Sequence, residues 1–318
     1  MAKIGKEIGK AKNLLTAGEL VAIPTETVYG LAANALDGMA VAKIFTVKAR
    51  PRFDPLIVHV HSVEQARDYA KAFPEKARIL ATAFWPGPLT LLLKKKDLIP
   101  DIVTSGLDTV GIRCPAHPLA LELLRQLPFP LAAPSANPFG YISPTTAHHV
   151  NAQLGELIPY ILDGGPCPVG VESTIVGFEN DTPVIYRQGG IAQEAIEDVV
   201  GHLVKKISPT AKPLAPGQLD SHYAPIKPLF LGDIALMQKQ PQHSNHGILR
   251  FKGAASANNE IILSKTGNLE EAARNLFAAL RQLDDMNVRT ILAEEVPDEG
   301  LGKAINDRLR RAATKALN

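Results

Sequence analysis

The chain has 318 residues, of which 46% are hydrophobic and 21% charged. This composition is that of a globular protein large enough to bury its own core, which excludes a disordered chain, and the length favours two domains. The formal net charge of +2 gives no sign of a nucleic-acid-binding protein.

Helical and strand-like patterns alternate from residue 4 to residue 203. The predicted elements are, in order, a helix at 4–15, a strand at 20–23, a helix at 39–47, a strand at 55–60, helices at 63–73 and 75–84, strands at 89–93 and 110–114, a helix at 118–127, a strand at 131–133, a helix at 145–154, strands at 160–162, 173–178 and 184–187, and a helix at 192–203. This alternation predicts an α/β domain with a twisted, mixed sheet and flanking helices.

A proline-rich segment, residues 205–228, interrupts this pattern. Its prolines and Gly217 exclude a long helix or a central strand and predict an ordered or semi-rigid linker. A second α/β pattern follows, with strands at 229–231, 247–251, 260–263 and 290–293 and helices at 269–283 and 301–316. We therefore expect a first domain at 1–204, a linker at 205–228 and a smaller α/β domain at 229–318.

The sequence carries no sign of a membrane or secreted protein. Apolar runs such as 89–93 are far shorter than a membrane-crossing helix, and residues 1–12 lack the apolar core of a signal peptide. Cys114 and Cys167 are isolated and have no metal-ligand spacing, so ordinary thiols in a reducing compartment are expected. A cytoplasmic protein fits these features.

Polar residues cluster directly beside several of the short apolar strands. The segment with Thr25, Glu26 and Thr27 follows the strand at 20–23 and either binds a ligand or forms a strand-end turn in which hydroxyls satisfy the backbone. Lys48 and Arg50, with Arg52 two residues on, are expected to alternate along an extended segment and point the same way. Such an arrangement suits a polyphosphate, although a solvated basic loop has the same sequence pattern.

Two further strands carry residues that are unusual inside apolar runs. His59 and His61, one residue apart, could share one face at the strand at 55–60; two ligands are too few for a structural zinc site, so we expect one of these histidines to face a ligand and no protein metal site. Arg113 lies within the apolar strand at 110–114, where an unpaired cation is costly. It therefore requires a carboxylate or phosphate partner, from the protein or from a ligand.

Other polar clusters follow the later strands and the linker: Ala133 to Asn137 with Ser143, Gly170 to Ile175 with Arg187, and His222 to Pro225. The chain has no Walker A pattern, dinucleotide-binding glycine motif, zinc-protease motif or nucleophile elbow.

These segments together resemble the threonylcarbamoyl-AMP synthases of the YrdC family, in the long form with a C-terminal extension. The resemblance runs from about Gly5 to Pro225 and rests on PTETVYGLAANA, KARPRFDPLIVHV, WPGPLTLLL, GIRCP, APSAN, DGGPCPVGVESTIV and PGQLDSHYAP. It implies a YrdC-like domain followed by a smaller Rossmann-like α/β domain. Three positions depart from the family pattern, Ala32 and Ala49 where glycine is usual and Asp54 where asparagine is usual; whether Asp54 faces ribose, metal or phosphate stays open.

The resemblance also implies a reaction and a site. The family joins L-threonine, bicarbonate and ATP, with Mg²⁺, to give threonylcarbamoyl-AMP and pyrophosphate. A tRNA threonylcarbamoyl-transferase complex then uses the product next to the anticodon, and a weak contact with tRNA itself is open. Threonine would be bound by Thr27, His59, Arg113, the Ala133 backbone and Ser173. ATP would be bound by Arg50, Asp54, Thr109, Ser135, Ser143, Arg187 and Tyr223. Lys48 and Arg50 would be the catalytic cations, with Arg52 beside them.

Two other functions are compatible with parts of the same pattern. One is an RNA-binding module without catalysis, which would show salt-sensitive tRNA binding and no threonine-dependent pyrophosphate release. The other is a carbamoyl-transferring enzyme with a different acceptor, which is disfavoured because the zinc-finger and acylphosphatase-like segments expected there are lacking in this chain.

Overall fold

The computed structural model describes residues 1–206, 214–217, 222–240 and 245–314. The expectations for residues 207–213 and 218–221 of the linker, and for the last two residues of the helix at 301–316, lie outside the described residues. None of the helices in the described part is both long and apolar enough to cross a membrane.

The larger domain is built on a mixed sheet of eleven strands, counted over the described residues. From one edge to the other the strands are β1 (Lys3–Gly5), β8 (Tyr160–Leu162), β2 (Val21–Ile23), β3 (Gly30–Asn34), β7 (Leu131–Ala132), β4 (Ile57–His59), β6 (Thr109–Arg113), β5 (Leu89–Lys94), β9 (Thr174–Glu179), β10 (Thr182–Arg187) and β11 (Val204–Lys205). Neighbours such as β4 and β6 run parallel, whereas β5 and β6 run antiparallel.

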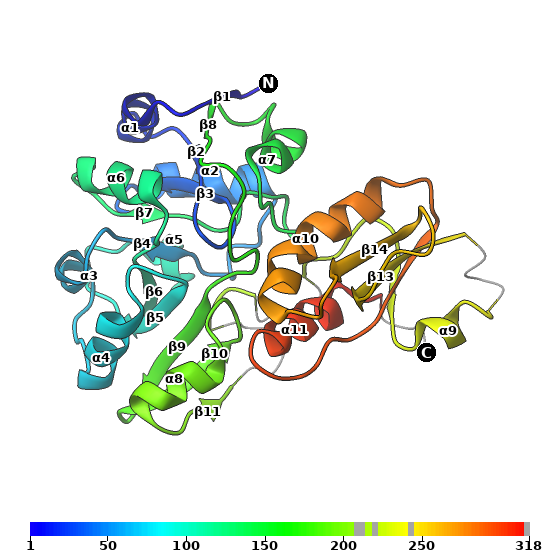
Figure 1. Ribbon diagram of the computed structural model, residues 1–318. Helices are drawn as coiled ribbons and strands as arrows, with labels where there is room; N and C mark the ends of the chain where they lie inside the picture. Colours follow the sequence, from blue (N-terminus) through cyan, green and yellow to red (C-terminus); the bar gives the residue numbers. More distant parts are fainter. Residues whose placement is uncertain (207–213, 218–221, 241–244, 315–318) are drawn as a thin grey trace.

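Eight helices of the described chain flank this sheet (Figure 1). They are α1 (Ile8–Thr16), α2 (Gly38–Lys48), α3 (Val63–Tyr69), α4 (Glu75–Phe84), α5 (Asp101–Thr104), α6 (Pro118–Gln126), α7 (Ala147–Leu154) and α8 (Gln193–Val200). The mixed sheet with flanking helices confirms the predicted α/β class.

Helix α2 shows how the local sequence sets an element that matters for the site. The Asp37 side chain accepts hydrogen bonds from the backbone N–H groups of Met39 and Ala40 and so begins the helix. The helix buries an apolar face that includes Ile44, and it ends where Ala49 adopts a left-handed conformation with φ of 49°. This ending fixes the direction in which the basic residues that follow leave the helix.

The smaller domain has a four-stranded, fully parallel sheet in the described residues, with the order β12 (Leu229–Leu231), β15 (Thr290–Ala293), β13 (His246–Lys252) and β14 (Glu260–Ser264). Its helices are α9 (Ile234–Met237), α10 (Leu269–Asp285) and α11 (Gly302–Ala312). Helices α10 and α11 lie between this sheet and the larger domain (Figure 1).

The two domains share one apolar cluster. Val28, Ile142 and Val171 of the larger domain pack with residues of the smaller domain such as Phe277 and Leu280 on α10. Removing these side chains from water stabilises the contact by about 1.5–3 kcal/mol for each large residue that is fully buried. The smaller domain is therefore fixed against the loops that follow β2 and precede β9.

The structure corrects two local expectations. The helix predicted at 4–15 begins only at Ile8, because Lys3–Gly5 pairs with β8 as strand β1. Strand β3 was not predicted at all: its sequence, GLAAN, lacks the β-branched and aromatic residues that mark strands, yet it pairs with β2 and β7 in the middle of the sheet.

Candidate active site

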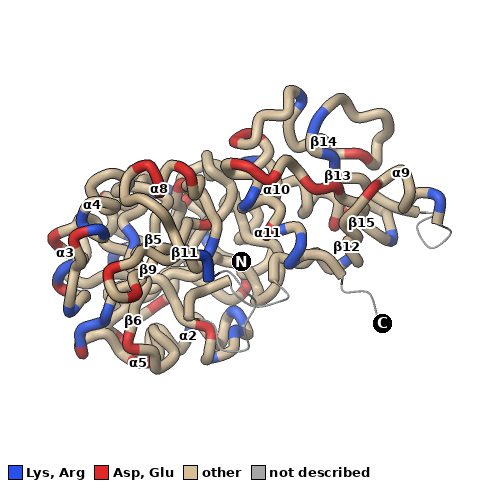
Figure 2. Tube along the Cα trace, turned by 90° about the horizontal axis from the view of Figure 1, so that it is seen from below, with Lys and Arg blue, Asp and Glu red and all other residues tan. Residues whose placement is uncertain are grey.

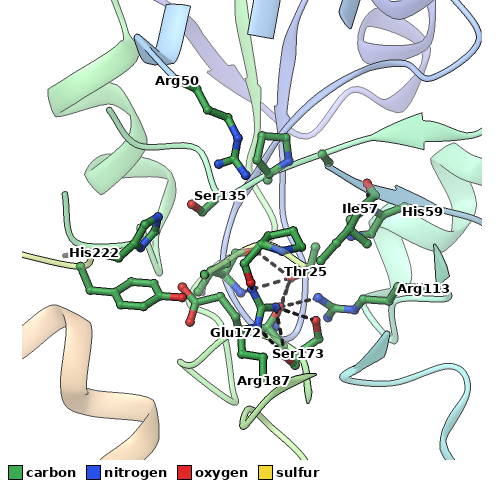
Figure 3. A pocket seen from close by; sticks show the side chains of 18 residues that line it. Thr25, Arg50, Ile57, His59, Arg113, Ser135, Glu172, Ser173, Arg187 and His222 are labelled. Carbon is green, nitrogen blue, oxygen red and sulfur yellow. Dashed lines mark hydrogen bonds between the residues drawn. The ribbon is translucent and has the colours of Figure 1, made fainter. Parts of the chain in front are cut away.

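A pocket of about 50 Å³ lies among the strand ends of the larger domain and the linker (Figure 3). The residues that line it are Thr25, Thr27, Val28, Gly30, Arg50, Ile57, His59, Arg113, Ala133, Pro134, Ser135, Glu172, Ser173, Arg187, Pro216, Gly217, His222 and Tyr223. We call this cavity the central pocket.

The sheet brings two of these side chains together directly. Strands β4 and β6 are parallel neighbours, and His59 is paired with Arg113 at the carboxyl end of each. Residues paired in this way project from the same face of a sheet. The close-up shows both side chains on one side of the central pocket (Figure 3).

Arg113 is held by partners from the segment after β2. Its Nη2 lies 2.7 Å from the Glu26 carboxylate, and its Nη1 donates to Thr27 Oγ1 at 2.8 Å. The same carboxylate accepts a hydrogen bond from the backbone N–H of Ala116. The partner that a buried arginine requires therefore comes from the protein, from a residue that the sequence analysis did not assign to the site. A guanidinium has five N–H donors, so donors remain for a ligand carboxylate.

His59 is neutral in this environment. Burial, followed by the nearby Arg113 charge, lowers the pKa of His59 to about 3. Its Nδ1 lies 3.2 Å from the carbonyl oxygen of Ile57. At neutral pH the His59 ring therefore lines the central pocket without a charge.

The basic residues at the end of α2 do not lie on an extended segment with their side chains pointing the same way, as the sequence suggested. Lys48 is the last residue of α2, only Arg50 lines the central pocket, and Arg52 is exposed. The alternation is broken because Ala49 turns left-handed at the helix end. Arg50 pairs with Asp54 at 2.8 Å and donates to the carbonyl oxygen of Pro55, so Asp54 already has a cationic partner.

Lys48 lies behind the wall of the central pocket. Its Nζ donates to the carbonyl oxygens of Ser135 and Asn137 and so supports the loop that follows β7. Burial, followed by the neighbouring Arg50 charge, lowers the pKa of Lys48 well below its usual value.

Arg187 differs from the other two arginines of the central pocket. It donates to the carbonyl oxygen of Ser173 from Nε and Nη2, to the Ser173 hydroxyl at 3.1 Å and to the carbonyl oxygen of Pro216 at 3.0 Å. Among the described residues no carboxylate lies within ion-pair distance of it. Within the described residues, the hydrogen bonds of this buried guanidinium go to neutral acceptors, and the Glu172 carboxylate acts on its charge from beyond ion-pair distance.

The end of the linker closes another side of the central pocket. Tyr223 is buried with φ of 66°, a strained conformation for a side chain of this size, and its ring stacks on Phe277 of α10 with centroids 5.6 Å apart. The His222 ring contacts both Tyr223 and Phe139 edge-on. Burial raises the pKa of Tyr223 to about 12, so it stays a neutral phenol.

The expected site residues therefore fall into two groups. Thr27, Arg50, His59, Arg113, Ala133, Ser135, Ser173, Arg187 and Tyr223 line the central pocket. Lys48, Asp54, Thr109 and Ser143 do not line it. Thr109 begins strand β6 while Arg113 ends it, which separates them by roughly 13 Å along the strand.

Three lining residues with polar side chains were absent from the expected site: Thr25, Glu172 and His222. All three stand in motifs that the sequence analysis singled out, so position within a motif was their only signal. Ser143 donates to Glu172 at 2.5 Å and so supports the wall from behind.

The carboxylates around the central pocket are occupied by protein cations. Asp54 pairs with Arg50, and Glu172 pairs with Arg308 at 3.0 Å. The described residues contain no group of three or more histidine, cysteine, aspartate or glutamate side chains that could hold a metal ion. The donor set therefore does not fit a metal held by the protein alone.

Comparisons with known proteins agree along the whole chain. The Sua5/YciO/YrdC family model, described as telomere recombination, matches residues 13–189, and the model of the threonylcarbamoyl-AMP synthase C-terminal domain matches residues 191–314. The threonylcarbamoyl-AMP synthases of Pyrococcus abyssi and Bacillus subtilis are each 44% identical, covering 95% and 96% of this chain and 93% of either relative. The crystal structure of P. abyssi Sua5 complexed with L-threonine superposes with a TM-score of 0.91 at 41% identity, covering 98% of this chain and 97% of that one.

Proposed function

Because this chain belongs to the threonylcarbamoyl-AMP synthase family, we propose that its central pocket joins L-threonine, bicarbonate and ATP into threonylcarbamoyl-AMP and releases pyrophosphate. The observation that carries the proposal is Arg187, a buried guanidinium with no carboxylate partner among the described residues. An anionic ligand supplies the charge that such a group lacks. With Arg50 and Arg113 it gives the central pocket three guanidinium groups, which suits a carboxylate and a triphosphate together.

L-threonine occupies the side of the central pocket formed by β4 and β6. Its carboxylate binds the donors of Arg113 that Glu26 and Thr27 leave free, and the Ala133 backbone and Ser173 lie around it. Neutral His59 adds a hydrogen-bonding group there without competing for the carboxylate. One methyl group distinguishes threonine from serine and is worth only about 1–3 kcal/mol, so discrimination against serine is modest.

ATP occupies the side formed by Arg50, Ser135, Arg187 and Tyr223. The threonine amine and bicarbonate give a carbamate and release water, and a carbamate oxygen then attacks the α-phosphorus as pyrophosphate leaves. Both reactants are anions, so the guanidinium groups lower the barrier by neutralising charge and holding them together. Positioning of two reactants can contribute about 7–11 kcal/mol. Lys48 and Asp54 act from behind the wall, on the Ser135 loop and on Arg50.

Mg²⁺ enters the proposal only as a companion of ATP. Magnesium sites are commonly made by substrate phosphates with one or two carboxylates, and here Asp54 and Glu172 are already paired with arginines. The ion would neutralise the triphosphate as it binds.

The product points to a downstream partner and a location. A mixed anhydride of a carbamate and AMP is reactive, so a transferase that moves the threonylcarbamoyl group to an adenosine next to the tRNA anticodon would consume it. Acidic and basic residues are interspersed along both domains, so at most a weak direct contact with tRNA is proposed (Figure 2). We place the enzyme in the cytoplasm, together with its tRNA partners.

Pyrophosphate release tests the proposed function. The purified chain is incubated with ATP and bicarbonate, with and without L-threonine, and the adenylate is identified by mass. We expect release to require L-threonine and to fall strongly with L-valine, which leaves a hydroxyl partner unpaired. An Arg113→Ala variant is the matched control, and calorimetry should show that it no longer binds threonine.

Pyrophosphate release that is the same with and without L-threonine would contradict the proposal. Tight, salt-sensitive tRNA binding without any turnover would instead favour the RNA-binding module. The full-length similarity to named synthases favours the enzyme.

A further inference from the structure

Helix α11 of the smaller domain brings a fully buried arginine to the rear wall of the central pocket. Arg308 is spaced along α11 with Ile305, Leu309 and Ala312, so it lies on the apolar stripe of the helix, and it has no exposed surface. An arginine in such a position is costly unless charged partners surround it. Its partners therefore show what it is there to do.

Those partners belong to the wall of the pocket. Arg308 Nε lies 3.0 Å from Glu172 Oε2, and its guanidinium carbon lies 5.1 Å from the centroid of the Tyr223 ring. Glu172 lines the central pocket, accepts a hydrogen bond from Ser143 at 2.5 Å and directly precedes Ser173. One side chain of the second domain thus contacts both the loop before β9 and the end of the linker.

Arg308 lies in a cluster of alternating acidic and basic side chains. Glu172 and Asp307 are the acids, and Arg308 and Arg311 are the bases; Asp307 pairs with Arg308 at 2.7 Å and with Arg311 at 2.9 Å. Without the Arg308 charge, the buried Glu172 carboxylate would lose its ion-pair partner beside the central pocket, and Arg187 would attract it from beyond ion-pair distance. A carboxylate in that position repels a triphosphate.

We propose that Arg308 is a positioning residue of the synthase reaction, which neutralises Glu172 and holds Glu172 and Tyr223 in the arrangement that admits ATP. Packing of the second domain then completes the nucleotide side of the central pocket. The proposal rests on the proposed function and adds to it a role for the smaller domain.

Steady-state kinetics on the full-length enzyme test this role. Arg308→Met is compared with Arg310→Met, a matched variant on the same helix whose arginine is exposed and paired with Glu295 at the surface. We expect Arg308→Met to raise the KM for ATP by about 10- to 100-fold, the size of a lost charged hydrogen bond. The KM for threonine and all parameters of Arg310→Met should stay within about twofold of the parent.

A second substitution separates electrostatics from folding. Adding Glu172→Gln to Arg308→Met removes the carboxylate charge that has lost its partner. The KM for ATP of the double variant should therefore be at least several-fold lower than that of Arg308→Met. A merely structural role of Arg308 predicts instead that the second substitution raises the KM for ATP further. Should Arg308→Met not fold, Arg308→Lys, which keeps the charge, is compared with Arg308→Gln. Three results would each overturn the proposal. Arg308→Met could have the same kinetics as Arg310→Met, Glu172→Gln could leave the KM for ATP of Arg308→Met unchanged, or Arg308→Lys and Arg308→Gln could have equal kinetics. An inactive parent enzyme would instead overturn the proposed function.

Discussion

His59 shows how burial fixes the charge state of a single residue in the central pocket. Its folded pKa of about 3 lies below the ordinary value of 6.5. As the pH falls below 6.5, the unfolded chain takes up a proton at this position and the folded chain does not. Stability is therefore fully present above about pH 7 and is lost as the pH falls towards 3, by about 2 kcal/mol at pH 5 from this group alone.

Urea unfolding at pH 7.5 and pH 5 measures this loss. We expect His59→Gln to remove about 2 kcal/mol of the difference between the two pH values, since it no longer titrates. His222 and His149 also have lowered pKa values, so a residual slope stays in the variant. The control is His202→Gln, because the side chain of His202 is 88% exposed. A pH dependence that is the same in the parent and in His59→Gln would contradict the assignment of a neutral, buried ring.

At the scale of single residues, the sequence located most segments of the site but not the direction of each side chain. Arg113 could be recognised because a cation within an apolar strand needs a partner. That the partner is Glu26 depends on the sheet, which brings two positions far apart in the chain within 2.7 Å. Lys48 does not line the central pocket for a local reason, since the left-handed turn at Ala49 replaces the expected extended backbone.

At the scale of elements, the loop before β9 is where the larger domain meets α10. Gly170 has φ of 79°, and a Cβ atom there would lie 2.4 Å from the Arg274 Cα and 2.6 Å from the Ala273 carbonyl oxygen. Only glycine fits both the backbone conformation and the contact. The loop continues into Glu172 and Ser173, so a shift at Gly170 moves the wall of the central pocket.

Gly170→Ala therefore separates contact from backbone strain. Its matched control is Gly106→Ala, because Gly106 has the same φ of 79° and nothing within 4 Å of the added Cβ. We expect both variants to lose about 1–2 kcal/mol from the left-handed conformation. Gly170→Ala should lose a further 1–3 kcal/mol or so from overpacking and should also raise the KM for ATP. Equal free energies of unfolding for the two variants would show that the loop does not depend on close packing against α10.

The predictability of each element followed the strength of its local pattern. Helices with a long apolar face, such as α10, were predicted close to their observed bounds. Strands β1 and β3 were missed, because three residues near the start of the chain and the small residues of GLAAN carry no strand signal of their own. Both exist because neighbouring strands pair with them, and such pairing is a tertiary effect.

At the scale of the molecule, the alternation of elements predicted two α/β units, and the structure contains a mixed and a parallel sheet. The sequence could not predict that the second unit packs onto the site, since those contacts join residues more than a hundred positions apart. Arg308 did carry a signal that went unused, as a charged residue in the apolar stripe of its helix. A similar buried cation, Arg281 on α10, lies at the same interface.

Arg281 provides a test of whether the domains unfold together. Its guanidinium donates to the carbonyl oxygen of Ile142 and, at 3.0 Å, to the Gln153 side chain, and it lies 5.1 Å from the Tyr141 ring centroid. These bonds cross the interface that the shared apolar cluster also spans, so we expect one calorimetric transition for the parent chain. Arg281→Met should weaken the interface by about 2–4 kcal/mol, because the charged hydrogen bonds to Ile142, Ser143 and Gln153 are lost.

The expected result for Arg281→Met is two resolved transitions by scanning calorimetry, with the smaller domain unfolding separately. Arg289→Met is the control, since Arg289 is exposed. A weakened interface should also raise the KM for ATP, because Arg308 reaches Glu172 only while the domains are docked. A single transition in Arg281→Met with the midpoint of the control would mean that the apolar cluster alone couples the domains. Two transitions with unchanged ATP kinetics would mean that docking does not shape the nucleotide side of the central pocket.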